Sequence, residues 1–148
     1  MHVTADTPDR DGSTIGPGPS GIVELAIPAG SDLLVLARLA VANIASRSGF
    51  DIEEIDDLRL AVDELCLSVL DGRRRGRLVL RFDGTADRIE VRCHYEGDDE
   101  PTDGGGVEDG TDGLSGRILD ALVDEHGPVA PGGWHGARLV KRRAVRDA

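Results

Sequence analysis

The sequence contains no apolar run long enough to cross a membrane, and residues 1–20 lack the basic-then-apolar order of a signal peptide. It has only two cysteines, Cys66 and Cys93, and both fall inside apolar-patterned segments. We therefore expect two buried, reduced thiols in a cytoplasmic protein rather than a disulfide framework. His94, His126 and His135 have no Cys or His partner at ligand spacing, so we expect no metal site.

Positive charge is scarce. The chain has 17 basic and 28 acidic side chains, and its formal net charge is −11. Such a chain repels phosphate backbones, so we expect no nucleic-acid partner, and the lack of an apolar span predicts no membrane partner. The charge favours a basic protein partner instead.

The 148 residues are enough for one domain with a core that needs neither disulfide nor metal. Residues 1–20 have almost no apolar side chains and predict a disordered tail, which leaves residues 21–146 as a single domain. Residues 96–112 hold eight acids and no base, which predicts a mobile acidic loop within that domain.

Helical periodicity appears in three segments. The first begins at Ser31-Asp32, which can cap it, and ends at Gly49. The second begins at Asp51, which with Glu54 forms an Asp variant of the capping box, and it ends at Gly72. The third extends from about Gly113 to His126. The second segment is the most clearly amphipathic, and its apolar face consists of Ile55, Leu58, Val62, Leu65, Cys66 and Val69.

Alternating patterns predict the strands. We expect a strand over Ile22–Ile27, a hairpin that turns at Asp83-Gly84, and a final pair around Pro131-Gly132-Gly133. The order of these elements predicts an α+β fold. It is a two-layer α/β sandwich with a mostly antiparallel sheet and three helices on one face.

Several simple sites are excluded or weak. The acidic loop has Asp103 where a calcium loop starting at Asp98 needs glycine, and no glutamate closes it. Neither Ser68 nor Ser115 lies in a nucleophile elbow. The basic turn Arg73–Arg77 could bind phosphate or an acidic partner, but such a cluster is more often a solubilising surface.

One ordered combination of segments is more specific, because it points to a protein family rather than to a general type of site. It consists of the helical run Ile55–Ser68, which includes DLRLAVDELC, then Tyr95-Glu96-Gly97-Asp98, then Asp112-Gly113-Leu114-Ser115-Gly116. These segments resemble the anti-sigma-factor serine kinases, a family of the superfamily that includes the ATPase domains of gyrase, histidine kinases and MutL. The resemblance covers roughly residues 22–145 and implies the histidine-kinase-like (GHKL) ATPase type of sandwich.

The resemblance also implies an ATP site, and the sequence departs from it at most positions. Glu64 matches the family's catalytic glutamate; an ordinary solvated helix residue is the other interpretation. Ser68 replaces the asparagine that binds magnesium one helical turn later. Tyr95 replaces the aspartate that reads adenine, although Gly97 is kept. Gly113 is kept in the phosphate turn, but Ser115 replaces its second glycine.

Three compromised polar contacts cost about 3–6 kcal/mol at about 1–2 kcal/mol each. That is roughly two to four decades in Kd, so we expect weak or absent binding of ATP and magnesium and no required cofactor. Loss of the magnesium ligand also damages phosphoryl transfer itself. A kinase fold with a degenerate ATP site is the predicted result.

The resemblance implies a homodimer that sequesters an alternative sigma factor and is released by an antagonist with a STAS-type fold. Arg38 matches a family arginine that contacts both partners; an ordinary exposed helix arginine is the other interpretation. Two further hypotheses stay open. The chain is an active serine kinase with Glu64 as base, or a module that binds another ligand in an altered pocket lined by Tyr95.

Overall fold

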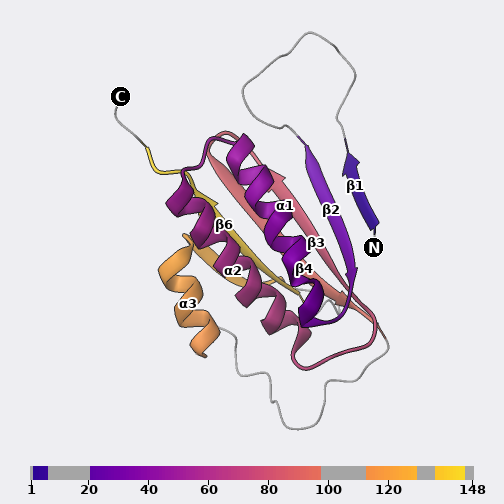
Figure 1. Cartoon of the computed structure of the whole chain (residues 1–148). Helices are drawn as coiled ribbons and strands as arrows, with labels where there is room; N and C mark the ends of the chain where they lie inside the picture. The colour runs from indigo at the N-terminus through magenta and orange to yellow at the C-terminus, as the bar shows by residue number, and fades with distance from the viewer. Residues whose placement is uncertain (1, 7–20, 98–112, 130–135, 146–148) are drawn as a thin grey trace.

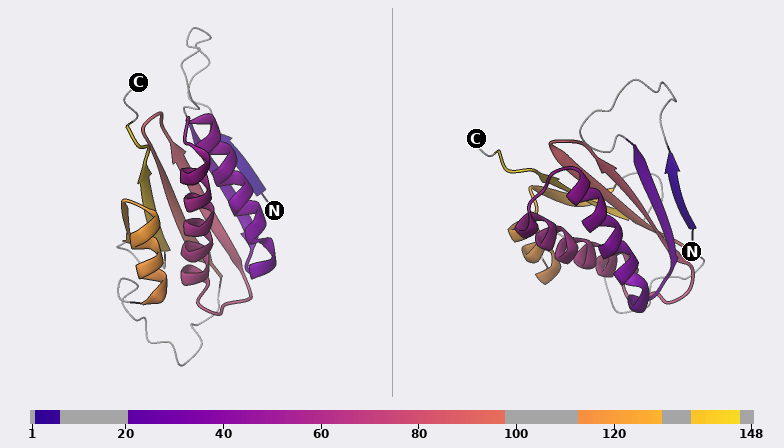
Figure 2. Two further views of the ribbon diagram at one scale, coloured as in Figure 1. Left: turned by 60° about the vertical axis from the view of Figure 1, so that its left-hand side comes forward. Right: turned by 45° about the horizontal axis from the view of Figure 1, so that its top comes forward.

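A computed structural model describes residues 2–6, 21–97, 113–129 and 136–145 of the chain. Its strands form one antiparallel sheet in the order β1-β2-β3-β4-β6-β5, and all three helices cover one face of that sheet (Figures 1 and 2). The predicted α+β sandwich is therefore confirmed. The elements are β1 (His2–Asp6), β2 (Ile22–Pro28), a 3₁₀ turn (Ser31–Leu33), α1 (Leu34–Arg47), α2 (Ile52–Leu70), β3 (Arg77–Gly84), β4 (Arg88–Glu96), α3 (Leu114–Leu122), β5 (Glu125–Val129) and β6 (Gly136–Arg142).

The corner between α1 and α2 is built as the sequence predicts. Gly49 adopts φ 86°, and the N–H groups of Gly49 and Phe50 donate to the carbonyls of Ser46 and Ala45, which is a Schellman ending. Asp51 then caps α2, because its side chain accepts from the Glu54 N–H while the Glu54 side chain accepts from the Asp51 N–H. The two antiparallel helices are thus joined with both ends satisfied.

The start of α1 differs from the prediction. Asp32 does not cap this helix; the chain enters it through a 3₁₀ turn, Leu33 is the N-cap, and no side chain caps the first N–H groups. A 3₁₀ turn is a common helix start, since its tighter hydrogen bonds satisfy part of what a cap would satisfy.

The central hairpin also turns later than predicted. Asp83 and Gly84 still belong to β3 and pair with Glu90 and Ile89. The turn is made by Thr85, whose N–H donates to the Arg88 carbonyl over 2.8 Å and whose hydroxyl accepts from the Arg88 N–H over 3.2 Å. A threonine side chain thus supplies hydrogen bonds that an Asp-Gly turn would make with backbone alone.

The third helix is shorter than predicted. It ends at Leu122, Val123 is extended, and the Asp124 N–H donates to the Val140 carbonyl over 3.0 Å. The following residues form β5, which pairs with β6 at the edge of the sheet. Pro128 is tolerated there because an edge strand has one side without ladder partners. The predicted turn at 131–133 lies outside the described residues.

The N-terminal segment differs from the predicted disordered tail. Residues 2–6 form β1, which pairs antiparallel with β2 from His2 opposite Ala26 to Asp6 opposite Ile22. The remainder of that tail and the acidic loop from residue 98 to 112 lie outside the described residues.

The core lies between the helices and the sheet. Leu65 is 1% exposed and Phe82 is fully buried, as the predicted apolar faces require. The largest fully buried side chains are Phe82, Ile27, Leu58, Leu65, Leu78, Leu80, Ile89 and Leu139. Among the described residues, no helix combines the length and the apolar character that a membrane crossing requires.

Candidate functional site

Glu64, the expected catalytic glutamate, is half-buried on α2. The Ser115 hydroxyl, in the first turn of α3, donates a hydrogen bond to Glu64 Oε2 over 2.9 Å. The structure therefore brings together two of the predicted site residues that lie far apart in the sequence. The contact also ties the start of α3 to the middle of α2.

Ser68 lies one turn further along α2, at the position expected for a magnesium ligand. Its side chain is exposed, and its hydroxyl donates to the carbonyl of Leu65 in the same helix over 2.8 Å. Serine hydroxyls in helices commonly bond in this way to the preceding turn. Among the residues that the structure describes, no three His, Cys, Asp or Glu side chains gather to hold a metal ion.

Gly113 is the N-cap of α3 and has an extended backbone, with φ −83° and ψ 175°. No side-chain cap accompanies it, and a Cβ built at this position would meet nothing within 4 Å. Neither the backbone nor the space around it therefore requires glycine here. This contrasts with Gly76, just before β3, and Gly97, just after β4, where an added Cβ would lie within 3 Å of other atoms.

Tyr95 is anchored to the turn between α2 and β3. Its hydroxyl donates to the carbonyl of Arg75, and the guanidinium of Arg73 lies 4.8 Å from the centre of its ring. A cation over an aromatic face at this distance is attractive. A Cβ at Gly97 would lie within 2.8 Å of Tyr95 Cζ, so glycine at 97 makes room for the ring. The residue expected at the adenine position thus packs against the protein itself.

Arg73 is a buried cation that the sequence does not reveal. The residue is only 8% exposed, whereas Arg74, Arg75 and Arg77 of the same basic turn are exposed. Its Nη1 donates to the Val69 carbonyl near the end of α2, and its buried Nε has no hydrogen-bond partner in the described structure. The helix C-terminus and the Tyr95 ring offset part of the cost of burying this charge.

Arg38 forms an ion pair across the helix layer. Its Nη1 lies 3.3 Å from Asp63 Oδ2 on α2, and the two side chains are 39% and 23% exposed. Burial raises the pKa of the Asp63 carboxyl, while the positive charge of Arg38 opposes that shift. The predicted partner-binding residue therefore also has a contact within the protein.

Exposed apolar side chains flank this ion pair, and none of them was predicted from the sequence. Val35 and Leu39 lie four residues apart on α1 and are 42% and 60% exposed. Leu60 and Leu67 lie seven residues apart on one face of α2 and are 56% and 46% exposed. The signal that could have revealed them is that all four fall outside the buried stripe of their helix.

The two cysteines are free and buried, as predicted. A hydrogen bond with Cys93, together with burial, raises the pKa of the Cys66 thiol well above its usual range. A thiol that resists ionisation is a weak nucleophile, so this pair belongs to the core rather than to a reactive site.

The fold and the segments that carry the predicted site residues agree with the expected architecture. The end of α2, the end of β4 and the start of α3 lie at one end of the molecule, the lower end in Figure 1. Glu64 and Ser115 are in contact with each other, and Tyr95 and Gly97 lie close together. Three helices on one face of an antiparallel sheet form an α+β fold that is consistent with a GHKL-type sandwich.

Comparison with known proteins confirms the resemblance predicted from the motifs. No family model matches the chain. The chain is 34% identical over 80 residues to serine-protein kinase RsbW of Bacillus subtilis (strain 168), covering 51% of this chain and 50% of that protein. It is 35% identical over 71 residues to the RsbW of Halalkalibacterium halodurans, covering 47% and 44%. The chain is thus similar to the RsbW serine-protein kinases, and it spans about half the length of the curated relatives that it matches.

Proposed function

We propose that the protein is a cytoplasmic anti-sigma factor that, as a homodimer, sequesters an alternative sigma factor and is released by a STAS-type antagonist. The observation that carries this proposal is the outward surface of α1 and α2, where Val35, Leu39 and Leu60 are exposed on either side of Arg38. Large apolar side chains grouped around a charged residue are typical of protein-binding surfaces. The similarity to RsbW supports the same class of function.

The proposal includes a degenerate ATP site. Two contacts support this part of the proposal: the Ser68 hydroxyl donates to its own helix, and the Tyr95 hydroxyl donates to the carbonyl of Arg75. The Ser115 hydroxyl also occupies one oxygen of the expected catalytic carboxylate, Glu64 Oε2. The covering of the Tyr95 ring by Arg73 also disfavours a different ligand in an altered pocket.

Binding of the sigma factor tests the proposal, and Arg38→Ala is the decisive variant. We expect it to weaken the affinity for the cognate alternative sigma factor by about tenfold, since a hydrogen bond to a charged group contributes about 1.5–3 kcal/mol. Its free energy of unfolding should change by no more than about 1 kcal/mol, because the Arg38–Asp63 pair is partly exposed. Surface plasmon resonance and urea unfolding measure the two quantities.

Asp63→Asn is the matched control for that experiment. It breaks the same ion pair but leaves the Arg38 guanidinium in place. If Arg38 contacts the partner, this control keeps the affinity; if Asp63→Asn weakens it equally, the ion pair only shapes the surface. No binding of any sigma factor from the same cell by the unaltered protein would reject sequestration.

An active serine kinase is the alternative, favoured by the kept Glu64 and by the name serine-protein kinase of the relatives. We expect calorimetric titration with ATP and excess magnesium to give no heat below millimolar nucleotide, because the three substituted positions of the expected site weaken nucleotide binding by roughly two to four decades. A micromolar Kd, together with phosphate transfer to a STAS-type partner that Glu64→Ala abolishes, would establish the kinase instead.

A further inference from the structure

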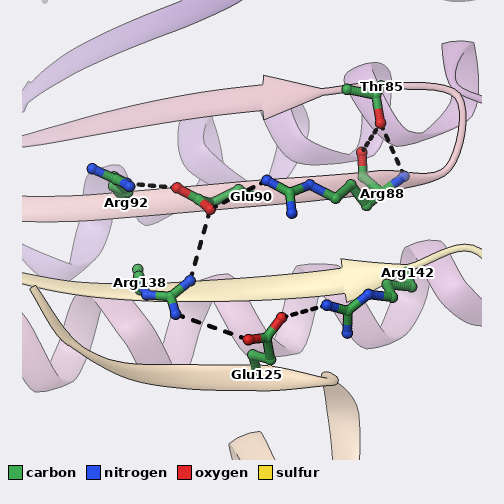
Figure 3. Close-up of polar contacts among 7 residues, drawn as sticks. All are labelled: Thr85, Arg88, Glu90, Arg92, Glu125, Arg138 and Arg142. Carbon is green, nitrogen blue, oxygen red and sulfur yellow. Dashed lines mark hydrogen bonds and ion pairs between the residues drawn. The ribbon is translucent and has the colours of Figure 1, made fainter.

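The face of the sheet opposite the helices carries a network of charged side chains. No described helix covers this face (Figure 2). Glu90 and Glu125 lie at the centre of the network, between arginines from β4 and β6 (Figure 3). The charged residues that alternation places on this face of β2 to β6 are Glu24, Arg77, Arg81, Asp83, Arg88, Glu90, Arg92, Glu96, Glu125, Arg138 and Arg142.

The strand register places like charges directly opposite one another. Arg81 on β3 is the partner of Arg92 on β4, and Arg92 is in turn the partner of Arg138 on β6. Residues directly opposite in an antiparallel pair have Cβ atoms about 4.5–5.5 Å apart, and like charges there destabilise the sheet. Three adjacent strands therefore present an unbroken row of guanidiniums, which folding alone does not favour.

The carboxylates of the face pair with two arginines of this row, Arg92 and Arg138, but they are shared with other arginines. Three arginines share Glu90. Its Oε1 lies 2.6 Å from Arg92 Nε, and its Oε2 lies 3.7 Å from both Arg138 Nη1 and Arg88 Nη2. Glu125 Oε2 lies 2.6 Å from Arg142 Nη2, and Glu125 Oε1 lies 4.0 Å from Arg138 Nη2. Arg81 has no ion pair among the described residues, although Glu24 lies opposite it on β2.

The face also differs in charge from the chain as a whole. On β2 to β6 it carries six arginines against five carboxylates, whereas the whole chain has a net charge of −11. Acidic side chains are thus concentrated elsewhere, and these five strands present a face that is far less acidic than the chain as a whole.

We propose that the open face of the sheet binds an acidic segment of a partner protein, whose carboxylates lie against the row Arg81, Arg92 and Arg138. The planar guanidinium presents paired N–H groups that match a carboxylate. A short acidic segment brings only a few charges toward a chain of net charge −11, whereas DNA brings one about every 1.7 Å of its axis and is repelled more strongly. This surface lies on the opposite side of the sheet from α1 and α2, so its test does not depend on the proposed sigma-binding function.

The test measures binding of a fluorescently labelled polyglutamate peptide by anisotropy at low salt. We expect the double variant Arg81→Gln/Arg92→Gln to weaken binding by about tenfold or more, and the affinity of the unaltered protein to fall as salt is raised. The matched control is Arg47→Gln/Arg59→Gln, which removes the same charge from the helix layer and should change the affinity by less than about twofold. Circular dichroism checks that both variants keep the fold.

Three outcomes would overturn the proposal. The first is equal loss of binding in the two double variants, which would mean that only net charge matters. The second is binding of a single-stranded oligonucleotide of equal charge as tightly as the peptide and through the same arginines, which would make the face a nucleic-acid surface. The third is that the double variant Arg81→Gln/Arg92→Gln sediments differently from the unaltered protein but binds the peptide equally well. That result would make the face an interface between copies of this chain.

Discussion

Replacing Leu65 with alanine is expected to lower the free energy of unfolding by about 2–5 kcal/mol. Leu65 is 1% exposed, and it lies on the face of α2 that packs against the sheet. The substitution removes apolar surface from the core and leaves a cavity that the surrounding side chains fill only in part. Urea unfolding followed by far-ultraviolet circular dichroism measures the change through the shift of the midpoint.

Leu60→Ala is the matched control on the same helix. Leu60 is 56% exposed, so the same loss of side chain should change stability by no more than about 0.5 kcal/mol. Equal midpoints for the two variants would contradict the packing of α2 against the sheet. The control also separates stability from binding, because Leu60 lies on the surface that we propose for the sigma factor.

Gly76→Ala is expected to destabilise the protein by about 1–3 kcal/mol from backbone strain, with a further cost from steric overlap. Gly76 adopts φ 86°, which side chains other than glycine rarely accept. A Cβ there would overlap the carbonyl oxygen of Glu96 and lie 3.0 Å from Gly97 Cα. Both are backbone atoms at the end of β4 or just after it, so neither can rotate away, and the thermal midpoint should fall accordingly.

Gly113→Ala provides the contrast for Gly76. Its φ of −83° suits any residue, and the added methyl would meet nothing within 4 Å. The substitution should therefore cost only what alanine loses to glycine as an N-cap, about 1 kcal/mol or less. If Gly76→Ala proved equally harmless, that result would contradict the close packing between the start of β3 and the end of β4.

Much of the fold could be predicted from local signals. The capping box at Asp51, the stop at Gly49 and the apolar face of α2 are encoded within a few neighbouring residues, and all three are confirmed. Residues 2–6 show no such signal, because β1 is held by pairing with β2, which depends on backbone groups of a distant segment. The end of α3 was missed for a related reason, since the pairing of β5 with β6 outweighs the helical pattern beyond Leu122.

The candidate site was predictable only as a set of positions. Glu64, Ser115 and Tyr95 could be named from the motifs, but the hydrogen bond between Glu64 and Ser115 depends on how α3 packs on α2. The burial of Arg73 could not be predicted, because three exposed arginines follow it in the same turn. Its position depends on the ring of Tyr95, which approaches from another strand.

The alternation of arginine with core residues along β4 has a consequence for how the sheet aligns. Val91 and Cys93 face the helices and are 0% and 1% exposed, while Arg92 between them is exposed on the other face. Slipping this strand by one residue would exchange the two faces and drive the Arg92 guanidinium into the core. Burying an unpaired charge has a large free-energy cost, which disfavours the slipped register. The arginines of the open face therefore disfavour misaligned strands, independently of any partner that the face binds.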